Sequence, residues 1–210
     1  MYQICRYLFF SLSLILLSLS TAIMVKVKYL GLYPWEAMSV GLFQKLGLSV
    51  GTWNIITGMT LMSCTLLLNK QYVKLGTFFN VILTGVFLDF ILSSNILPDA
   101  TNTWTDYIYL LIGITLFGMS GGMNVSAGFG AGPRDGFMLA ISPRFGWSIA
   151  RMRIVVESIV VVIAFLLGGP VFFTTLIYTF ISSPIYQRSL FFHQAFFQKL
   201  KKKEIEVLES

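Results

Sequence analysis

Histidine and cysteine are scarce in this chain of 210 residues, and each shortage excludes a class of chemistry. The single histidine, His193, lies near the end of the chain, which argues against a Ser/His/Asp or Cys/His hydrolase and against zinc chemistry through histidine. The two cysteines, Cys5 and Cys64, lack metal-ligand spacing and do not suggest a disulfide. We therefore expect a protein that is not an enzyme, with no catalytic residues, no metal and no cofactor.

Charge is also scarce, at a level that excludes an ordinary soluble domain. Charged residues make up 11% of the chain, against roughly a quarter in soluble domains. Hydrophobic residues make up 56%, and the mean hydropathy is +0.78. The apolar runs are continuous rather than alternating, which favours spanning helices over a β-barrel. We predict an all-α, polytopic transmembrane bundle in contact with the lipid bilayer, and we attribute its net charge of +6 to membrane orientation rather than to nucleic-acid binding.

Several apolar runs have the length needed to cross about 30 Å of hydrocarbon. The six predicted spans are residues 7–25, 51–68, 75–92, 106–125, 148–167 and 171–186, the last interrupted late by Pro184. The first run has a competing interpretation as a secretory signal peptide, because Ser20-Thr21-Ala22 resembles a cleavage site. Its length, and a counterpart in the second half of the chain, favour a span.

Two further segments, each led by a proline, are too short to span. After Pro34, apolar residues recur at helical spacing from Trp35 to Leu46. The second segment, residues 128–136, is rich in glycine, and Pro133 is suited to open a short helix because a first-turn residue needs no N–H partner. We expect both to be interfacial or re-entrant helices.

An offset of 99 residues aligns the second half of the chain with the first. It pairs Pro34 with Pro133 and Glu36 with Asp135. Each half then holds three spans and one proline-led helix, and because three is odd the halves must cross the membrane in opposite directions, as in many secondary transporters. The predicted divisions are a first repeat (1–92), an extracytoplasmic loop (93–105), a second repeat (106–188) and a basic cytoplasmic tail (189–210).

The distribution of basic residues gives an independent indication of orientation. With the N-terminus in the cytoplasm, twelve of the fifteen Lys and Arg residues are cytoplasmic, and the loop at 93–105 has none. The twelve are Arg6, Lys70, Lys74, Arg134, Arg144, Arg151, Arg153, Arg188, Lys199, Lys201, Lys202 and Lys203. The positive-inside rule therefore predicts six spans with both termini in the cytoplasm.

Several motifs resemble one family of bacterial integral membrane proteins, the YczE/YyaS/YitT group. They are the run Gly-Ala-Gly-Pro-Arg-Asp-Gly at 130–136, the pair Arg153 and Glu157, Leu-Gly-Gly-Pro at 167–170 and Gly-Thr-Trp at 51–53. The chain departs from the expected pattern at Phe-Thr-Thr (173–175) and Ser-Pro (183–184), where we would expect a glycine. The resemblance implies a multi-pass protein of the bacterial plasma membrane, in a family whose members are described as transporters.

Glu157 is the most pointed candidate for a functional side chain. It lies inside the fifth predicted span, where a carboxylate is costly unless it is paired or hydrated. The structural alternative is a local ion pair with Arg153, one helical turn away. Both interpretations stay open.

A second group of polar residues falls within the other predicted spans. Asp89 lies near the outer end of the third span, on which Asn80 also lies. With Asn54 and Asn124 of neighbouring spans, these side chains could form a small polar lining. The alternative is that Asp89 meets interfacial water and the amides hold helices together.

The glycine-rich turn offers a third candidate site. It consists of Gly130, Gly132, Pro133, Arg134, Asp135 and Gly136. Its backbone N–H groups could form an anion nest, with the charged pair in a substrate or ion site. Alternatively, it is a cytoplasmic turn whose arginine meets lipid headgroups. The turn lacks the rest of either phosphate-binding motif, which argues against a nucleotide site.

Two functional hypotheses follow from these patterns. The first is a small secondary transporter or exporter of a small molecule or ion, supported by the inverted repeat, the interrupted segments and the buried acids. The alternative is a non-transporting membrane scaffold that supports partner proteins. A cavity containing Glu157 would favour transport, whereas a scaffold would fill that space with Phe and Leu. The oligomeric state, including a homo-oligomer, is left open.

Overall fold

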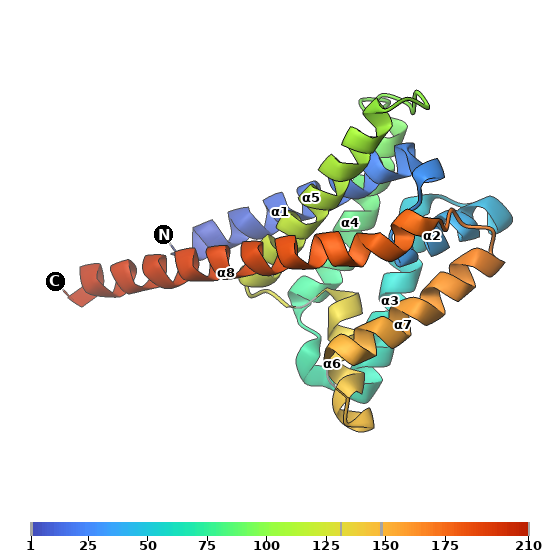
Figure 1. Cartoon of the computed structure of the whole chain (residues 1–210). Helices are drawn as coiled ribbons and strands as arrows, with labels where there is room; N and C mark the ends of the chain where they lie inside the picture. Colours follow the sequence, from blue (N-terminus) through green and yellow to red (C-terminus); the bar gives the residue numbers. More distant parts are fainter. Residues whose placement is uncertain (1, 131, 148, 210) are drawn as a thin grey trace.

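A computed structural model describes residues 2–130, 132–147 and 149–209, and every regular element in these ranges is helical, as expected from the sequence (Figure 1). The elements are α1 (Tyr2–Lys26), η1 (Lys28–Leu30), α2 (Pro34–Leu46), α3 (Val50–Leu68), η2 (Lys70–Tyr72), α4 (Leu75–Ser93), α5 (Thr105–Ser126), α6 (Pro133–Phe145), α7 (Ile149–Leu166) and α8 (Phe173–Glu209). The two η elements are single turns of 3₁₀ helix.

Within the described residues, four helices are both long enough and apolar enough to cross a membrane: α1, α3, α4 and α5. The helices α7 and α8 are not among them, so the structure bears out four of the six predicted spans. Arg151, Arg153 and Glu157 give α7 three charges in 18 residues. The predicted first residue of that span, Ser148, lies outside the described residues.

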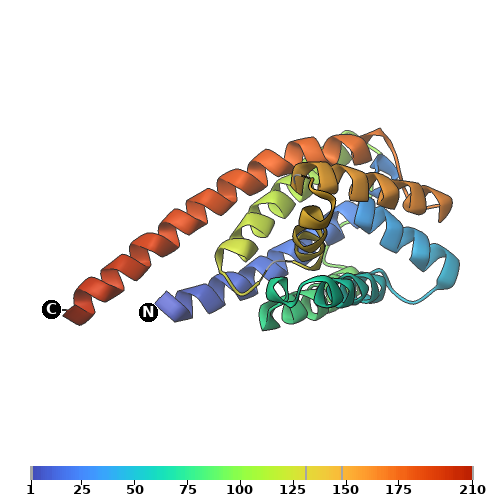
Figure 2. The ribbon, with the colours of Figure 1, turned by 90° about the horizontal axis from the view of Figure 1, so that it is seen from below.

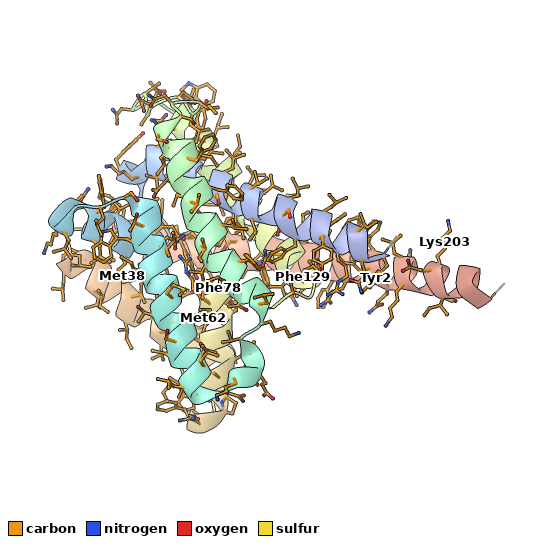
Figure 3. The ribbon with its side chains drawn as sticks, turned by 180° about the vertical axis from the view of Figure 1, so that it is seen from behind. Tyr2, Met38, Met62, Phe78, Phe129 and Lys203 are labelled. Carbon is orange, nitrogen blue, oxygen red and sulfur yellow. The ribbon has the colours of Figure 1, made fainter. Side chains whose placement is uncertain are left out.

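α8 differs from the expected short span followed by a separate tail. It is one helix of 37 residues that continues through Pro184 to Glu209, about 55 Å at 1.5 Å per residue (Figure 1). Its far half packs on the start of α1 through aromatic rings, including Phe9 against Phe196 with 5.4 Å between the centroids. Figure 3 shows Tyr2 beside this part of α8 and Lys203 further out along it.

The helices α1 and α5 pack antiparallel at the centre of the bundle. At one end Arg6 Nε donates to the carbonyl oxygen of Ala127 at 2.7 Å, and at the other end Gly113 lies against Met24. α4 packs on α1, and α8 packs along α5 (Figures 1 and 2). Gly122 permits the second contact, because a Cβ there would lie 2.5 Å from the carbonyl oxygen of Tyr186.

The proline-led helices α2 and α6 have 13 residues each and begin as predicted, at Pro34 and Pro133. α2 packs on α7 and α3, whereas α6 packs on α3 and α7. Their first turns face each other, because Arg134 of α6 contacts Glu36 of α2. Pro133 lies beside Gly58, in the middle of α3, so α6 begins level with the centre of a longer helix.

The far ends of α2 and α6 reach the ends of longer helices from the other half of the chain. Lys45 Nζ donates to the carbonyl oxygen of Leu166 at the end of α7, at 2.8 Å. Arg144 Nη2 donates to the carbonyl oxygen of Leu68 at the end of α3, at 3.0 Å. A cation at a helix C-terminus stabilises both the free carbonyl groups and the helix dipole.

Candidate functional site

A cavity of about 150 Å³ opens where the first turns of α2 and α6 meet. Its walls come from α1, α3, α4, α5, α7 and α8 as well as from these two turns. Two helix N-termini therefore converge on one space, and each carries unsatisfied N–H groups and the positive end of a helix dipole. Pro34 and Pro133 suit these positions because the first helical turn needs no N–H from them.

Five charged side chains line the cavity: Glu36, Arg134, Asp135, Arg153 and Glu157. Three are carboxylates and two are guanidinium groups, so the ionised set carries a formal charge of −1. Glu36 and Asp135 both lie in the first turn of a short helix, where a negative charge offsets the helix dipole.

Arg134 connects the two short helices through a buried ion pair. Its Nη1 donates to Glu36 Oε1 at 2.9 Å, and its Nη2 donates to Asn54 Oδ1 of α3 at 3.1 Å. The Glu36 side chain is only 4% exposed and that of Arg134 is 20% exposed. The guanidinium also lies over two rings of the α2 entrance, 5.8 Å from the centroid of Tyr33 and 5.4 Å from that of Trp35.

Arg153 and Glu157 of α7 form the other charged wall. Arg153 Nη2 donates to Asp135 Oδ1 at 2.6 Å, whereas its Nε lies 3.9 Å from Glu157 Oε1. Glu157 Oε1 accepts a hydrogen bond from the Tyr33 hydroxyl. The i,i+4 pair anticipated from sequence is thus present, but the shorter contact of Arg153 is to Asp135 of α6.

Two atoms on these walls are buried without a hydrogen-bond partner in the described part of the chain. They are Glu36 Oε2, an acceptor, and Arg153 Nε, a donor. Trp35 Nε1, beside the cavity, is in the same condition. Buried polar atoms in this state are costly, and a bound ligand or ordered water is the usual explanation for them.

Asn80 and Asn124, proposed as part of a polar lining, come together in the structure. Asn80 Nδ2 donates to Asn124 Oδ1 at 2.8 Å, and Asn124 Nδ2 donates to Ser13 Oγ at 2.8 Å. All three side chains are buried, and the chain of bonds joins α4, α5 and α1. The two asparagines also line the cavity. They therefore both hold helices together and contribute polar atoms to the cavity.

Asp89 lies elsewhere and is not among the residues that line this cavity. Its Oδ1 accepts from the backbone N–H of Gly51 at 2.8 Å, and its Oδ2 accepts from the Ser49 hydroxyl. Asp89 therefore satisfies free donors at the N-terminus of α3, a position where a carboxylate is stabilised. Close packing helps, since a Cβ on Gly51 would lie 2.5 Å from the Asp89 carboxyl carbon.

The glycine-rich turn divides between two roles. Arg134 and Asp135 line the cavity, as do Gly132 and Pro133. Gly130 packs instead against the first turn of α4, with a φ of +139° that favours glycine, and its Cβ position would lie 2.6 Å from Thr77 Oγ1. The turn thus provides both a close contact between helices and two charged side chains of the cavity.

Two cavity residues, Glu36 and Tyr33, were not among the candidates chosen from the sequence. Glu36 had a recognisable signal, because the 99-residue offset aligns it with Asp135. Tyr33 had none, because a tyrosine before a proline is unremarkable until Glu157, 124 residues away, is brought to its hydroxyl.

Long apolar helices around a buried polar cavity define the chain as a helical, multi-pass membrane protein. A family model described as a family of unknown function, DUF6198, matches residues 4–189, and the chain belongs to this family. It is 36% identical over 188 residues to the uncharacterized membrane protein YczE of Bacillus subtilis, covering 89% of this chain and 86% of the relative. These findings confirm the resemblance noted from the motifs.

Two further relatives are similar over most of their length. An uncharacterized protein of Haemophilus influenzae is 33% identical over 181 residues, covering 84% of this chain and 78% of the relative. The uncharacterized protein YyaS of Bacillus subtilis is 26% identical over 175 residues, covering 82% and 86%. No solved structure matches the chain significantly.

Proposed function

We propose that this protein is a small secondary transporter rather than an enzyme, and that the cavity between α2 and α6 is its substrate site. The observation that carries the proposal is the convergence of two short-helix N-termini on a cavity lined by five charged side chains. Secondary transporters commonly bind substrates and coupling ions near the bilayer midplane, at the ends of broken helices.

The proposed architecture is two inverted three-span repeats, with α7 and the first half of α8 as the fifth and sixth spans. Support comes from two glycines that are 99 residues apart and make similar contacts. Gly31, before α2, lies against Thr174 of α8, whereas Gly130, before α6, lies against Thr77 of α4. The residues that precede each short helix therefore pack against the last helix of the opposite half. The antiparallel packing of α1 on α5 agrees with inversion.

In this architecture α2 and α6 are re-entrant from opposite sides of a bacterial plasma membrane. Both chain termini are cytoplasmic, in keeping with the positive-inside rule. Arg153 and Glu157 line the cavity, which lets α7 cross the bilayer with these two charges away from lipid. Arg151, in the first turn of α7, is exposed.

A scaffold is the alternative, and the cavity itself argues against it. A scaffold needs no buried charge, and filling the centre of the bundle with Phe and Leu would be more stabilising than maintaining ion pairs there. Retaining Glu157 at the wall of a cavity is what a carrier requires if the carboxylate exchanges a proton or cation during transport.

The test is solute movement into vesicles that hold only this protein. Purified protein would be reconstituted and challenged with labelled amino acids, organic ammonium ions, carboxylates, sugars and alkali cations, with a proton or sodium gradient imposed. We expect uptake of one class above that of empty vesicles, and loss of gradient dependence in Glu157→Gln. Asp99→Asn is the matched control, because Asp99 is 88% exposed and lies outside the cavity. Uptake equal to that of empty vesicles for every class, from folded protein, would refute the proposal.

A further inference from the structure

The charges around the cavity nearly cancel when the backbone is included. Three carboxylates and two guanidinium groups give −1, and the two helix N-termini contribute roughly +0.5 each. A lone cation or a lone anion would leave the cavity with an unbalanced full charge. A ligand that carries one charge of each sign would preserve the balance.

Two buried polar atoms without a hydrogen-bond partner also indicate a ligand with one charge of each sign. Glu36 Oε2 needs a donor and Arg153 Nε needs an acceptor, and both residues line the cavity. Glu36 is 3% exposed, so water cannot easily satisfy its carboxylate from outside. A cation alone would satisfy Glu36 and leave Arg153 Nε without an acceptor, and an anion alone would do the reverse.

The aromatic side chains and the volume narrow the ligand further. Tyr33 lines the cavity, and an aromatic ring attracts an ammonium group. The Arg134 guanidinium, 5.8 Å from the ring centroid, already makes such a contact. The cavity volume of about 150 Å³ equals that of an engineered protein cavity that holds benzene, so it suits a ligand of about six heavy atoms.

Resting on the transporter proposed above, we propose that the cavity binds a small zwitterion, with its ammonium group on Glu36 Oε2 and its carboxylate on Arg153 Nε. The ligand class is an amino acid of about six heavy atoms, the size that the volume permits. The ammonium group donates to Glu36, and the carboxylate accepts from Arg153 and faces the positive N-termini of α2 and α6.

The test uses the unmodified protein in detergent and a set of matched probes. L-alanine, D-alanine, β-alanine and sarcosine are isomers that carry both charges. L-alaninamide keeps the ammonium group but not the carboxylate, and L-lactate keeps the carboxylate but not the ammonium group. We expect at least one isomer to raise the melting temperature and to bind in calorimetry, with the amide and lactate binding at least tenfold more weakly.

Variants then test which side chain binds the ammonium group and which binds the carboxylate. Arg153→Lys keeps the charge beside Asp135 but removes the Nε donor, and Glu36→Gln removes the acceptor charge; each should weaken binding at least tenfold. Asp99→Asn and Arg188→Gln, both at exposed positions, should leave it unchanged. If Glu36→Gln does not fold, binding of the probes to the unmodified protein still tests whether the ligand needs both charges.

The outcomes separate this inference from the proposed function. Three results would overturn the zwitterion site while leaving transport of another class possible: binding of the amide alone, binding of lactate alone, or no binding of any isomer at 10 mM. A dissociation constant of 10 mM corresponds to a binding free energy of about −2.7 kcal/mol. Binding of an isomer, together with no uptake of any solute class into vesicles, would support the site and refute the transporter.

Discussion

At the scale of single residues, the cavity depends on how its buried carboxylates share two arginines. In the part of the chain that the structure describes, Glu36 forms an ion pair with Arg134, and the Glu36 side chain is 4% exposed. Arg153 serves Asp135, whose side chain is 31% exposed and can still be hydrated. Removing one partner of a buried pair costs more than removing one partner of a half-exposed pair, because the remaining charge has no water to solvate it.

We therefore predict that Arg134→Gln destabilises the protein more than Arg153→Gln does. Breaking a buried ion pair costs about 3–5 kcal/mol, which for a chain of this size lowers the melting temperature by roughly 6–20 °C. The double variant Arg134→Gln with Glu36→Gln should recover part of this loss, because neither charge is then left alone. Thermal unfolding of the purified variants measures both effects, and equal losses for the two arginines would contradict the prediction.

The charged residues of α7 are recognisable in the sequence, whereas the ranking of their partners is not. The four-residue spacing of Arg153 and Glu157 suggested that one neutralises the other. The structure puts Asp135 closer to Arg153, at 2.6 Å against 3.9 Å for Glu157, because the first turn of α6 packs on α7. That contact depends on tertiary packing, which no local spacing encodes.

Tyr29 gives a pH-dependent test outside the spans. Its hydroxyl donates to Asp106 Oδ2 at 2.7 Å, and this hydrogen bond, followed by desolvation, raises the pKa of Tyr29 from 10.0 to about 12. The neutral phenol is the form that the folded state favours. Its contribution to stability is therefore complete below pH 10 and is lost as the pH rises through 12.

We predict that Tyr29→Phe melts at a lower temperature than the unmodified protein near neutral pH, and that this gap narrows between pH 10 and 12. Melting curves of both proteins across that range provide the measurement. Tyr7→Phe, at a position that is also 60% exposed but far from Tyr29 in the sequence, is the control and should follow the unmodified protein throughout. A gap that stays constant to pH 12 would mean that the hydroxyl does not titrate as stated.

At the scale of elements, the two short helices are anchored at their far ends by matching cations. Lys45 and Arg144 are 99 residues apart, and they cap the C-termini of α7 and α3 respectively. We predict that Lys45→Met and Arg144→Met each lower the melting temperature by a similar, small amount. An exposed charge at a helix end is worth about 0.3–1 kcal/mol, or roughly 1–4 °C here.

Lys201→Met, in the exposed tail, is the control for this pair and should leave the melting temperature unchanged. The double variant Lys45→Met with Arg144→Met should lower the melting temperature by the sum of the two single losses, because the two side chains cap different helices. A large effect from one cap and none from the other would indicate that the short helices are not anchored equivalently.

The contact between α5 and α8 gives a sharper test at the same scale. A Cβ on Gly122 would meet backbone atoms of α8, at 2.5 Å from Tyr186 O and 2.6 Å from Leu190 N. We predict that Gly122→Ala forces the helices apart and costs about 1–3 kcal/mol by overpacking. Gly132→Ala is the control, because the nearest atom would be Asp135 Oδ2 at 4.0 Å. Unchanged melting temperatures for both variants would argue against this close packing.

The helices themselves were predictable, and their ends less so. Apolar runs and prolines located α1 to α7, since length and proline position are local properties. The continuation of α8 through Pro184 was not predicted, because a proline usually ends a helix. Proline is tolerated where neighbouring helices support the freed backbone groups. In α8 the residues beyond it pack on α1, through contacts such as Phe9 with Phe197.

At the scale of the whole molecule, the sequence predicts a repeat because both halves carry a proline, an acid and glycines at one offset. The cavity could not be predicted in this way, because its walls come from six long helices and both short ones. The exchange of contacts between halves, such as Gly31 with α8, also has no local signature. Sequence symmetry thus predicts which segments correspond, whereas packing decides which of them meet.

The proposed inverted architecture predicts which loops face outward. In a background with Cys5 and Cys64 replaced by serine, Asn102→Cys lies in the loop between α4 and α5, and Lys201→Cys lies near the end of α8. With six spans and cytoplasmic termini, a membrane-impermeant maleimide added to intact cells should label the first and not the second. Both should react once the membrane is opened. If both Asn102→Cys and Lys201→Cys were labelled in intact cells, the two residues would lie on the same side of the membrane. The proposed architecture places three crossings between them, and an odd number of crossings requires opposite sides. The three helices α5, α7 and α8 would then not all span, and the two halves would not be inverted copies.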